Sequence, residues 1–177
     1  MIAIDRNPPL GFTLTAATNG GIQTMRAIGL SVSLALTLMA TCYADAREYL
    51  KDNFPQSRGF STGVVTEGGK TVWLAGQNAL MDEQGRSMAG NLEGQARVIL
   101  RKIDAAVKRA GGSLKDVVTM TVYLTDPRQL DPLVPIFREF FPDGNFPAKT
   151  TITVPSLAVM GMMLEITAVA VIGDKSP

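Results

Sequence analysis

Histidine is absent from the 177 residues of this chain, and cysteine occurs once, at Cys42. Without an imidazole the protein cannot build a Ser-His-Asp or Cys-His catalytic group, or a zinc site with histidine ligands. Cys42 falls in a segment that we interpret as a leader, so the domain after it has no disulfide and no thiolate nucleophile. Its chemistry must use carboxylates, amines, hydroxyls and backbone groups, and we expect neither a metal ion nor a cofactor.

An excess of charge of one sign is also missing. Lysine and arginine number 17 and aspartate and glutamate 16, which leaves a net charge of +1. A nearly neutral chain gives no electrostatic basis for binding nucleic acid or an anionic membrane. We therefore expect no nucleic-acid partner.

Residues 25–46 have the pattern of a secretory signal peptide. Met25-Arg26 is a short basic start, residues 27–40 are uncharged and apolar, and Ala44-Asp45-Ala46 is a small-x-small cleavage site. The apolar run of about 14 residues is too short to cross a bilayer comfortably, so we expect no stable membrane span after cleavage.

Three segments follow from this pattern. We interpret residues 1–24 as a disordered upstream extension, 25–46 as the signal peptide, and 47–177 as one domain in the periplasm or outside the cell. Two alternatives stay open. Residues 39–42 weakly resemble a lipoprotein cleavage box, which would anchor the chain by lipid at Cys42. The apolar run can also be a buried core helix.

Hydrophobic periodicity and turn residues predict alternating strands and helices in the domain. Pro135 suits the first turn of its helix better than the middle. In order, we expect a loop through Gly59, a strand at 60–66, a hairpin turn at 67–70, a strand at 71–75, a helix at 91–110, a strand at 117–125, a helix at 132–141, and strands at 149–154 and 162–172.

The helix at 91–110 has the clearest pattern. Asn91 can cap its start, and Gly111-Gly112 can end it in a left-handed turn. Its basic residues fall mostly on other faces than the apolar one, which is typical of a solvated helix surface, with a nucleic-acid surface as the alternative. The apolar positions recur at three- and four-residue steps and form one stripe: Leu92, Ala96, Ile99, Ile103, Val107 and Ala110.

The last strand is largely apolar on both faces. Two helices are too few to cover both sides of a sheet, so we expect a second copy of the chain to cover the other side. One face carries Leu164, Ile166, Ala168 and Ala170, and the other carries Met163, Glu165, Thr167, Val169 and Val171.

An ordered set of short motifs resembles the RidA (YjgF) family over nearly all of residues 55–172. The motifs are Ala75-Gly76-Gln77, Gly94-Gln95, Ala110-Gly111-Gly112, Leu114-Lys115-Asp116-Val117-Val118, Phe140-Phe141, Phe146-Pro147-Ala148-Lys149 and Leu164-Glu165-Ile166-Thr167-Ala168-Val169-Ala170. The resemblance implies a chorismate-mutase-like α+β fold, with one mixed sheet and two helices on one face. It also implies a homotrimer with a ligand cleft at each subunit boundary.

The resemblance assigns the main site roles to two residues. Lys149 stands where the active branch of the family has an arginine that binds the substrate carboxylate, and lysine keeps the charge but not the bidentate fork. Glu165 matches the glutamate that handles the attacking water. For Lys149 the alternative is a strand-end lysine that reaches solvent, and for Glu165 a rim residue or a structural ion pair, for example with Lys149.

Other positions of the implied site depart from the family pattern. Phe60 replaces a tyrosine, Val134 an asparagine and Thr167 a second glutamate, which makes the cleft more apolar. Backbone groups near Gly76 and Gln77 can still supply hydrogen bonds to a ligand.

Two functions are compatible with this pattern. The first is a hydrolytic deaminase that converts small 2-imino or enamine acids to 2-oxo acids and ammonia. The second is a noncatalytic trimer that binds small carboxylate-bearing or apolar molecules. Ribonuclease activity, a label that some relatives carry, is disfavoured because histidine and a basic excess are both missing.

Overall fold

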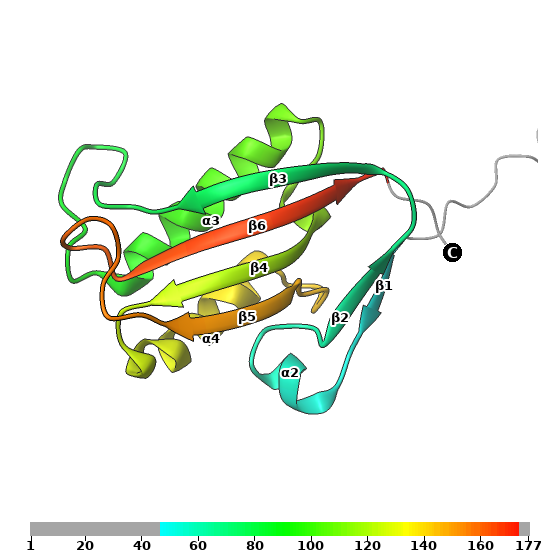
Figure 1. Cartoon of the computed structure of the whole chain (residues 1–177), viewed down its shortest axis with the longest axis horizontal. Coiled ribbons are helices and arrows are strands. Elements are labelled where there is room, and N and C mark those ends of the chain that lie inside the picture. The colour runs from blue at the N-terminus through cyan, green and yellow to red at the C-terminus, as the bar shows by residue number, and fades with distance from the viewer. Residues whose placement is uncertain (1–46, 174–177) are drawn as a thin grey trace, which may run out of the picture. The chain divides into compact units, whose positions relative to one another are not determined.

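The computed structural model of the chain describes residues 47–173 (Figure 1), and the predicted extension and signal peptide lie outside these residues. No helix in this part of the chain is long and apolar enough to span a membrane. The elements are β1 (Arg47–Leu50), α2 (Asn53–Ser57), β2 (Gly63–Thr66), β3 (Lys70–Gln77), α3 (Leu92–Arg109), η1 (Leu114–Asp116), β4 (Val117–Leu124), η2 (Pro127–Gln129), α4 (Leu130–Phe140), β5 (Ala148–Thr153) and β6 (Leu164–Ile172).

Four strands form the main sheet in the order β3-β6-β4-β5. β6 is antiparallel to both of its neighbours, while β4 and β5 are parallel, so the sheet is mixed. Helices α3 and α4 lie on the same face of the sheet (Figure 1), and the buried side chains of both helices and of β4 and β6 form one core. The predicted α+β class, a mixed sheet with two helices on one face, is confirmed.

Helix α3 forms as its sequence predicts. The Asn91 side chain accepts a hydrogen bond from the Gly94 amide at 2.9 Å, which satisfies one of the free donors of the first turn. Gly111, at φ +93°, ends the helix, and the Gly112 amide donates to the Val107 carbonyl. Among its basic residues, Arg97 is paired with carboxylates of α3 and α4, as on an ordinary solvated surface.

The start of the domain differs from the prediction in two ways. The expected loop contains β1 and α2, and the expected hairpin between residues 60–66 and 71–75 does not form. β2 pairs instead with β1, and β3 pairs with β6. Gly68 and Gly69, both at positive φ, turn the chain from the small sheet into the main sheet.

Pro135 lies inside helix α4 and not in its first turn, because the helix begins earlier than predicted. The short η2 helix precedes it and carries the chain directly into the first turn. Pro135 is exposed, so its ring faces solvent and the cost is mainly one missing backbone hydrogen bond.

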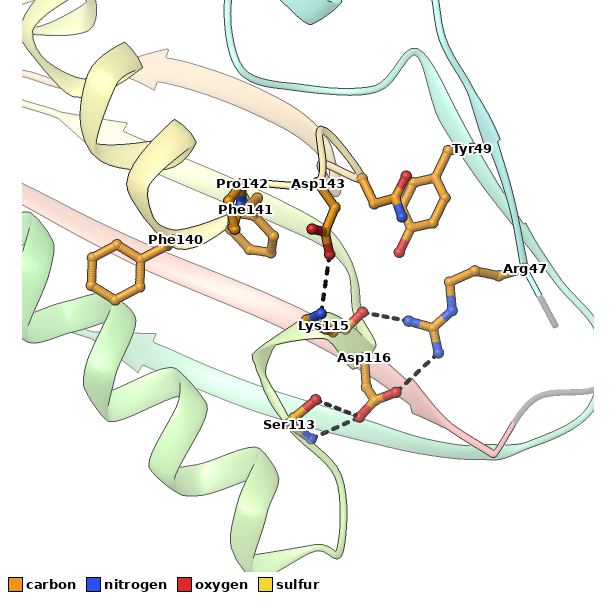
Figure 2. Close-up of a pocket in the computed structure, with 10 residues that line it drawn as sticks. Arg47, Tyr49, Ser113, Lys115, Asp116, Phe140, Phe141, Pro142 and Asp143 are labelled. Atoms are coloured by element: carbon orange, nitrogen blue, oxygen red, sulfur yellow. Dashed lines mark hydrogen bonds and ion pairs between the residues drawn. The ribbon is translucent and has the colours of Figure 1, made fainter. Parts of the chain in front are cut away.

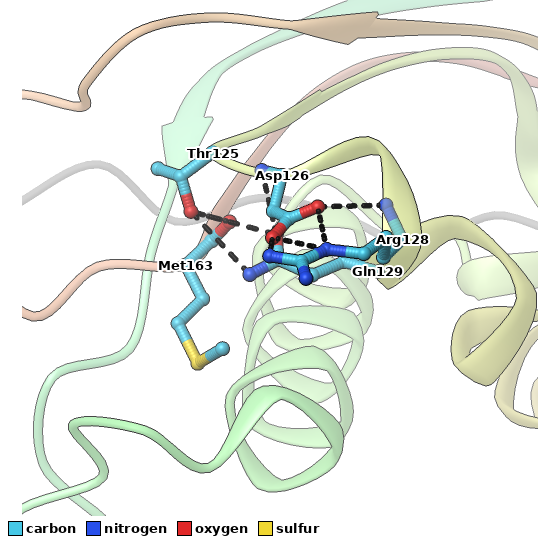
Figure 3. A network of polar contacts seen from close by, with 5 residues as sticks. All are labelled: Thr125, Asp126, Arg128, Gln129 and Met163. Atoms are coloured by element: carbon cyan, nitrogen blue, oxygen red, sulfur yellow. Dashed lines mark hydrogen bonds and ion pairs between the residues drawn. The ribbon is translucent and has the colours of Figure 1, made fainter.

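A polar network fixes the start of β6 against the end of β4 (Figure 3). The Thr125 amide donates to the Met163 carbonyl at 3.1 Å, and the Thr125 hydroxyl donates to the same oxygen. Asp126 caps η2, where its carboxylate accepts from the Arg128 amide at 2.9 Å. Hydrogen bonds from the side chain and amide of Arg128, together with its charge, lower the pKa of Asp126 to about 2. The network fixes the backbone two residues before Glu165.

Gln95, which is fully buried on α3, holds two loops at the same end of the sheet. Its amide nitrogen donates to the carbonyls of Met88 and Gly161, and its oxygen accepts from the Met163 amide at 2.9 Å. The loop before α3 has backbone hydrogen bonds of its own, and the buried Gln95 side chain adds the hydrogen bonds that join it to the loop before β6. This explains why a polar residue occupies the apolar face of the helix.

The sheet face opposite the helices, which we call the open face, is not covered by any other element of residues 47–173, and it carries apolar side chains beside threonines and Glu165. Trp73 on β3 is 80% exposed and stands beside Val169 of β6 in the strand register. Val169 is half-buried on this face. Two residues expected on the uncovered surface differ: Met163 precedes β6 and packs against the core, and Val171 is buried. The Arg47 side chain donates to the Val171 carbonyl, which shows that β1 reaches this end of β6.

Candidate functional site

Lys149 lies on β5 with its side chain on the helix face of the sheet. It pairs in register with Met120, whose side chain is in the core. The ammonium group is 3.8 Å from the centre of the Phe137 ring and 5.6 Å from that of Phe60. It donates to the backbone carbonyls of Arg58 at 3.3 Å and Gly59 at 3.1 Å. The side chain is half-buried, so the alternative of a lysine that simply extends into solvent does not describe it.

The surroundings of Lys149 lower its pKa. Burial, and after it the charge of Arg58, lower the pKa of Lys149 to about 8. A larger fraction of Lys149 is therefore a neutral amine at pH 7 than of an exposed lysine, which is almost wholly protonated.

The Lys149 pocket has a volume of about 240 Å³ and is lined by Phe54, Arg58, Phe60, Leu130, Lys149 and Thr151. Two cationic groups thus share one small, mostly apolar space. Arg58 is ion-paired with Asp131, a carboxylate that is 78% exposed at the rim. A volume of this size suits a small organic acid, and the two cations would stabilise its carboxylate.

Glu165 lies on the open face. It alternates along β6 with the buried Leu164 and Ile166, and it pairs with Tyr123 of β4. Its carboxylate occupies the space beside Gly76, where an added methyl group would overlap it. Within residues 47–173 the Glu165 carboxylate forms no hydrogen bond or ion pair, so it is available to a ligand or to another copy of the chain.

Within one protomer, the two principal site residues lie on opposite faces of the sheet. Lys149 contacts α4 on the covered face, and Glu165 projects from the open face. The ion pair between them that the sequence allowed as an alternative is not formed among the described residues. A ligand bound to Lys149 can meet a Glu165 carboxylate only if that carboxylate comes from a second copy.

The other predicted site residues divide between these two places. Phe60 lines the Lys149 pocket, and Val134 of α4 lies close to Gly59, whose carbonyl accepts from Lys149. Gly76 and Gln77 lie at the end of β3, where the register with β6 is irregular, next to Glu165. The side-chain amide nitrogen of Gln77 donates a hydrogen bond to the Ala75 carbonyl.

A second pocket, of about 320 Å³, lies between β1, η1 and the loop before β5 (Figure 2). Its charged groups are already matched. Arg47 is paired with Asp116 at 3.1 Å and donates to the Lys115 carbonyl, and Lys115 is paired with Asp143. The Arg47 side chain is only 8% exposed, so this pocket is a junction that fastens β1 to the main sheet.

Among residues 47–173, no three Cys, Asp or Glu side chains gather closely enough to hold a metal ion. The charged groups of the candidate site are the Lys149 amine, the Arg58 guanidinium and the Glu165 carboxylate.

Comparison with known proteins shows that the chain matches a known family. The family model described as "Endoribonuclease L-PSP" matches residues 51–172, which include every predicted site residue. The chain is a member of the RidA/YjgF family. A RutC family protein of Pyrococcus horikoshii is 31% identical over 119 residues, which are 67% of this chain and 92% of that protein.

Two further RidA-family proteins bear on the site and the fold. Human 2-iminobutanoate/2-iminopropanoate deaminase is 30% identical over 114 residues, or 64% of this chain and 80% of the human protein. The crystal structure of the Rid family protein YyfB from Yersinia pestis, described as of unknown function, superposes with a TM-score of 0.64 at 25% identity. The superposition covers 72% of this chain and 99% of the YyfB chain.

Arg58 and Trp73 were not among the residues predicted from the sequence. Arg58 stands in a segment expected to be an irregular loop, and only its position beside Lys149 gives it significance. The face of Trp73 could have been predicted from the sequence, because strand alternation places it on the same face as the uncovered residues of β6.

Proposed function

We propose that this protein hydrolyses small 2-imino or enamine acids to 2-oxo acids and ammonia. The observation that carries the proposal is the Lys149 pocket, where an amine and a guanidinium share a small apolar space. The name of the human relative supports the substrate class. Lys149 and Arg58 would hold the substrate carboxylate, and a Glu165 carboxylate would activate water at the imine carbon.

The proposal requires an oligomer, and we propose a homotrimer. On the open face the exposed Trp73 stands beside the half-buried Val169, and a second copy that covers them would bring its own groups to the subunit boundary. Sedimentation at micromolar concentration should show a trimer, and a monomer under those conditions would contradict the proposal.

Export is part of the same proposal. An enzyme outside the cytoplasm would act on imines that amino-acid oxidases release there. The N-terminal sequence of the protein recovered from a secreting host should begin at Arg47, whereas a lipid-modified Cys42 at the N-terminus would support the anchored alternative.

The activity is tested by generating a 2-imino acid with an amino-acid oxidase and following its loss above the spontaneous rate. Wild type should accelerate the loss, and Glu165→Gln should reduce the acceleration by about 100-fold or more, the range expected for a general acid-base group. Glu83→Gln, at an exposed glutamate on the surface, is the matched control and should retain wild-type turnover. A wild-type rate equal to that of buffer would refute the proposal.

A noncatalytic binding trimer is the second candidate. Phe60 and Val134 carry neither the hydroxyl nor the amide implied by the family pattern, which favours binding over catalysis. A binder would be stabilised against heating by a small 2-oxo acid without accelerating imine loss.

A further inference from the structure

The position of Lys149 permits chemistry that a guanidinium at the same place does not. A neutral amine is a nucleophile toward carbonyl and imine carbons, whereas a guanidinium stays protonated and serves only to bind anions. Lys149 donates to two backbone carbonyls and lies over the rings of Phe137 and, farther away, Phe60, and none of these contacts is with a carboxylate. No negative charge in contact with it therefore fixes it in the ammonium form.

The same pocket contains a separate cation for the substrate carboxylate. Arg58 lines the Lys149 pocket and lies close enough for its charge to act on Lys149. Its partner Asp131 is exposed at the rim, so solvent screens that ion pair and a substrate anion can compete for the guanidinium. Carboxylate binding and nucleophilic attack can thus belong to two different side chains.

We propose that Lys149 forms a covalent Schiff base with the carbon skeleton of the substrate while Arg58 binds its carboxylate. This inference rests on the proposed deaminase function for the identity of the substrate, and it gives Lys149 the role of a nucleophile in place of that of a second carboxylate-binding cation. The 2-imino acid enters as its iminium ion, the neutral Lys149 amine adds to the iminium carbon, and the carbon–nitrogen π electrons move to the substrate nitrogen.

Proton transfer from the lysine nitrogen to the substrate nitrogen then lets ammonia leave. The remaining product is a protonated Schiff base between Lys149 and the 2-oxo acid skeleton. Water adds to its carbon, the bond to Lys149 breaks, and the 2-oxo acid is released with Lys149 as its ammonium form. Loss of one proton from Lys149 restores the nucleophile, so the net reaction consumes one water and releases ammonium, without oxidation or reduction.

The reverse of the last step gives a direct test. The purified protein is incubated with pyruvate and sodium cyanoborohydride, digested and analysed by mass spectrometry. Lys149 should carry a 1-carboxyethyl group at least tenfold more often than exposed lysines such as Lys102, and imine hydrolysis should fall in proportion to this modification. Lys149→Arg should abolish the adduct at that position, whereas Lys102→Arg should leave the Lys149 adduct unchanged.

The role of Arg58 is tested by a pair of carbonyl compounds. Arg58→Gln should reduce trapping of pyruvate at least about tenfold relative to acetaldehyde, which has no carboxylate, because the substrate anion loses its charge-assisted hydrogen bonds to the guanidinium. An equal loss with both compounds would show that Arg58 acts only on the structure or protonation of Lys149.

The results separate the covalent inference from the proposed function. Imine hydrolysis without an adduct at Lys149 would overturn the Schiff base and leave the deaminase function standing. A selective Lys149 adduct without faster imine loss would support the covalent site and refute the deaminase function. Adducts spread evenly over exposed lysines would overturn the covalent site.

Discussion

Gly76 of β3 leaves free the space that the Glu165 carboxylate of β6 occupies. A methyl group at position 76 would overlap the carboxylate oxygen and come close to the rest of that side chain. Gly76 has an ordinary backbone conformation, so the absence of a side chain, and not a positive φ, is what the position requires. The glycine therefore determines where the proposed water-activating group lies.

Gly76→Ala should separate activity from stability. The atoms that must move are at the flexible end of Glu165, so we expect a cost of about 1 kcal/mol or less in the free energy of unfolding. Displacement of the carboxylate should nevertheless lower imine turnover at least tenfold. Urea unfolding and imine turnover would be measured on the same protein. Full turnover in the alanine variant would mean that the position of Glu165 does not matter.

The Lys149 pocket should give the protein a distinctive dependence of stability on pH. The folded-state pKa of Lys149, about 8, lies below the ordinary value of 10.5. Between these values the unfolded chain binds a proton that the folded chain lacks, so stability rises with pH. Relative to Lys149→Met, wild type should gain on the order of 3 kcal/mol from pH 8 to 10.5. A constant difference between the two proteins across this range would show that the lysine is not desolvated.

The junction at β1 should depend on one partly buried ion pair. Arg47 and Asp116 are 8% and 22% exposed, and Asp116 also caps η1 through Ser113. Arg47→Met leaves that carboxylate without its cation and should cost about 3 kcal/mol in the free energy of unfolding. Lys115→Met removes an exposed pair with Asp143 in the same pocket and should cost less than about 1 kcal/mol. Equal effects in chemical denaturation would contradict this assignment.

Local patterns predicted most of the main sheet and α3. The stripe from Leu92 to Val107 and the β-branched run of β4 identify elements whose type depends on burial along one segment. The β1–β2 ladder could not be predicted in this way, because pairing depends on which distant strand competes for each edge. Gly68 and Gly69 are compatible with either a hairpin or a corner, and only the tertiary partners decide.

The candidate site was predictable as a set of residues but not as an arrangement. The alternation in β6 places Glu165 on the face opposite the core, and this follows from the sequence alone. The face of Lys149 depends on its parallel register with Met120, and its environment depends on Phe137 of α4. Neither contact can be recognised from the residues around position 149. Only the structure shows that the sheet separates Lys149 from Glu165.

Mixing two defective variants tests most directly whether the site is shared between copies. Lys149→Met and Glu165→Gln would be purified separately, unfolded together in equal amounts and refolded, with each variant refolded alone as the control. If every site takes its lysine and its glutamate from neighbouring copies of a cyclic assembly, about one quarter of the sites in the mixture are intact. We predict recovery of about a quarter of wild-type imine turnover; a mixture that stays as inactive as its components would contradict the shared site.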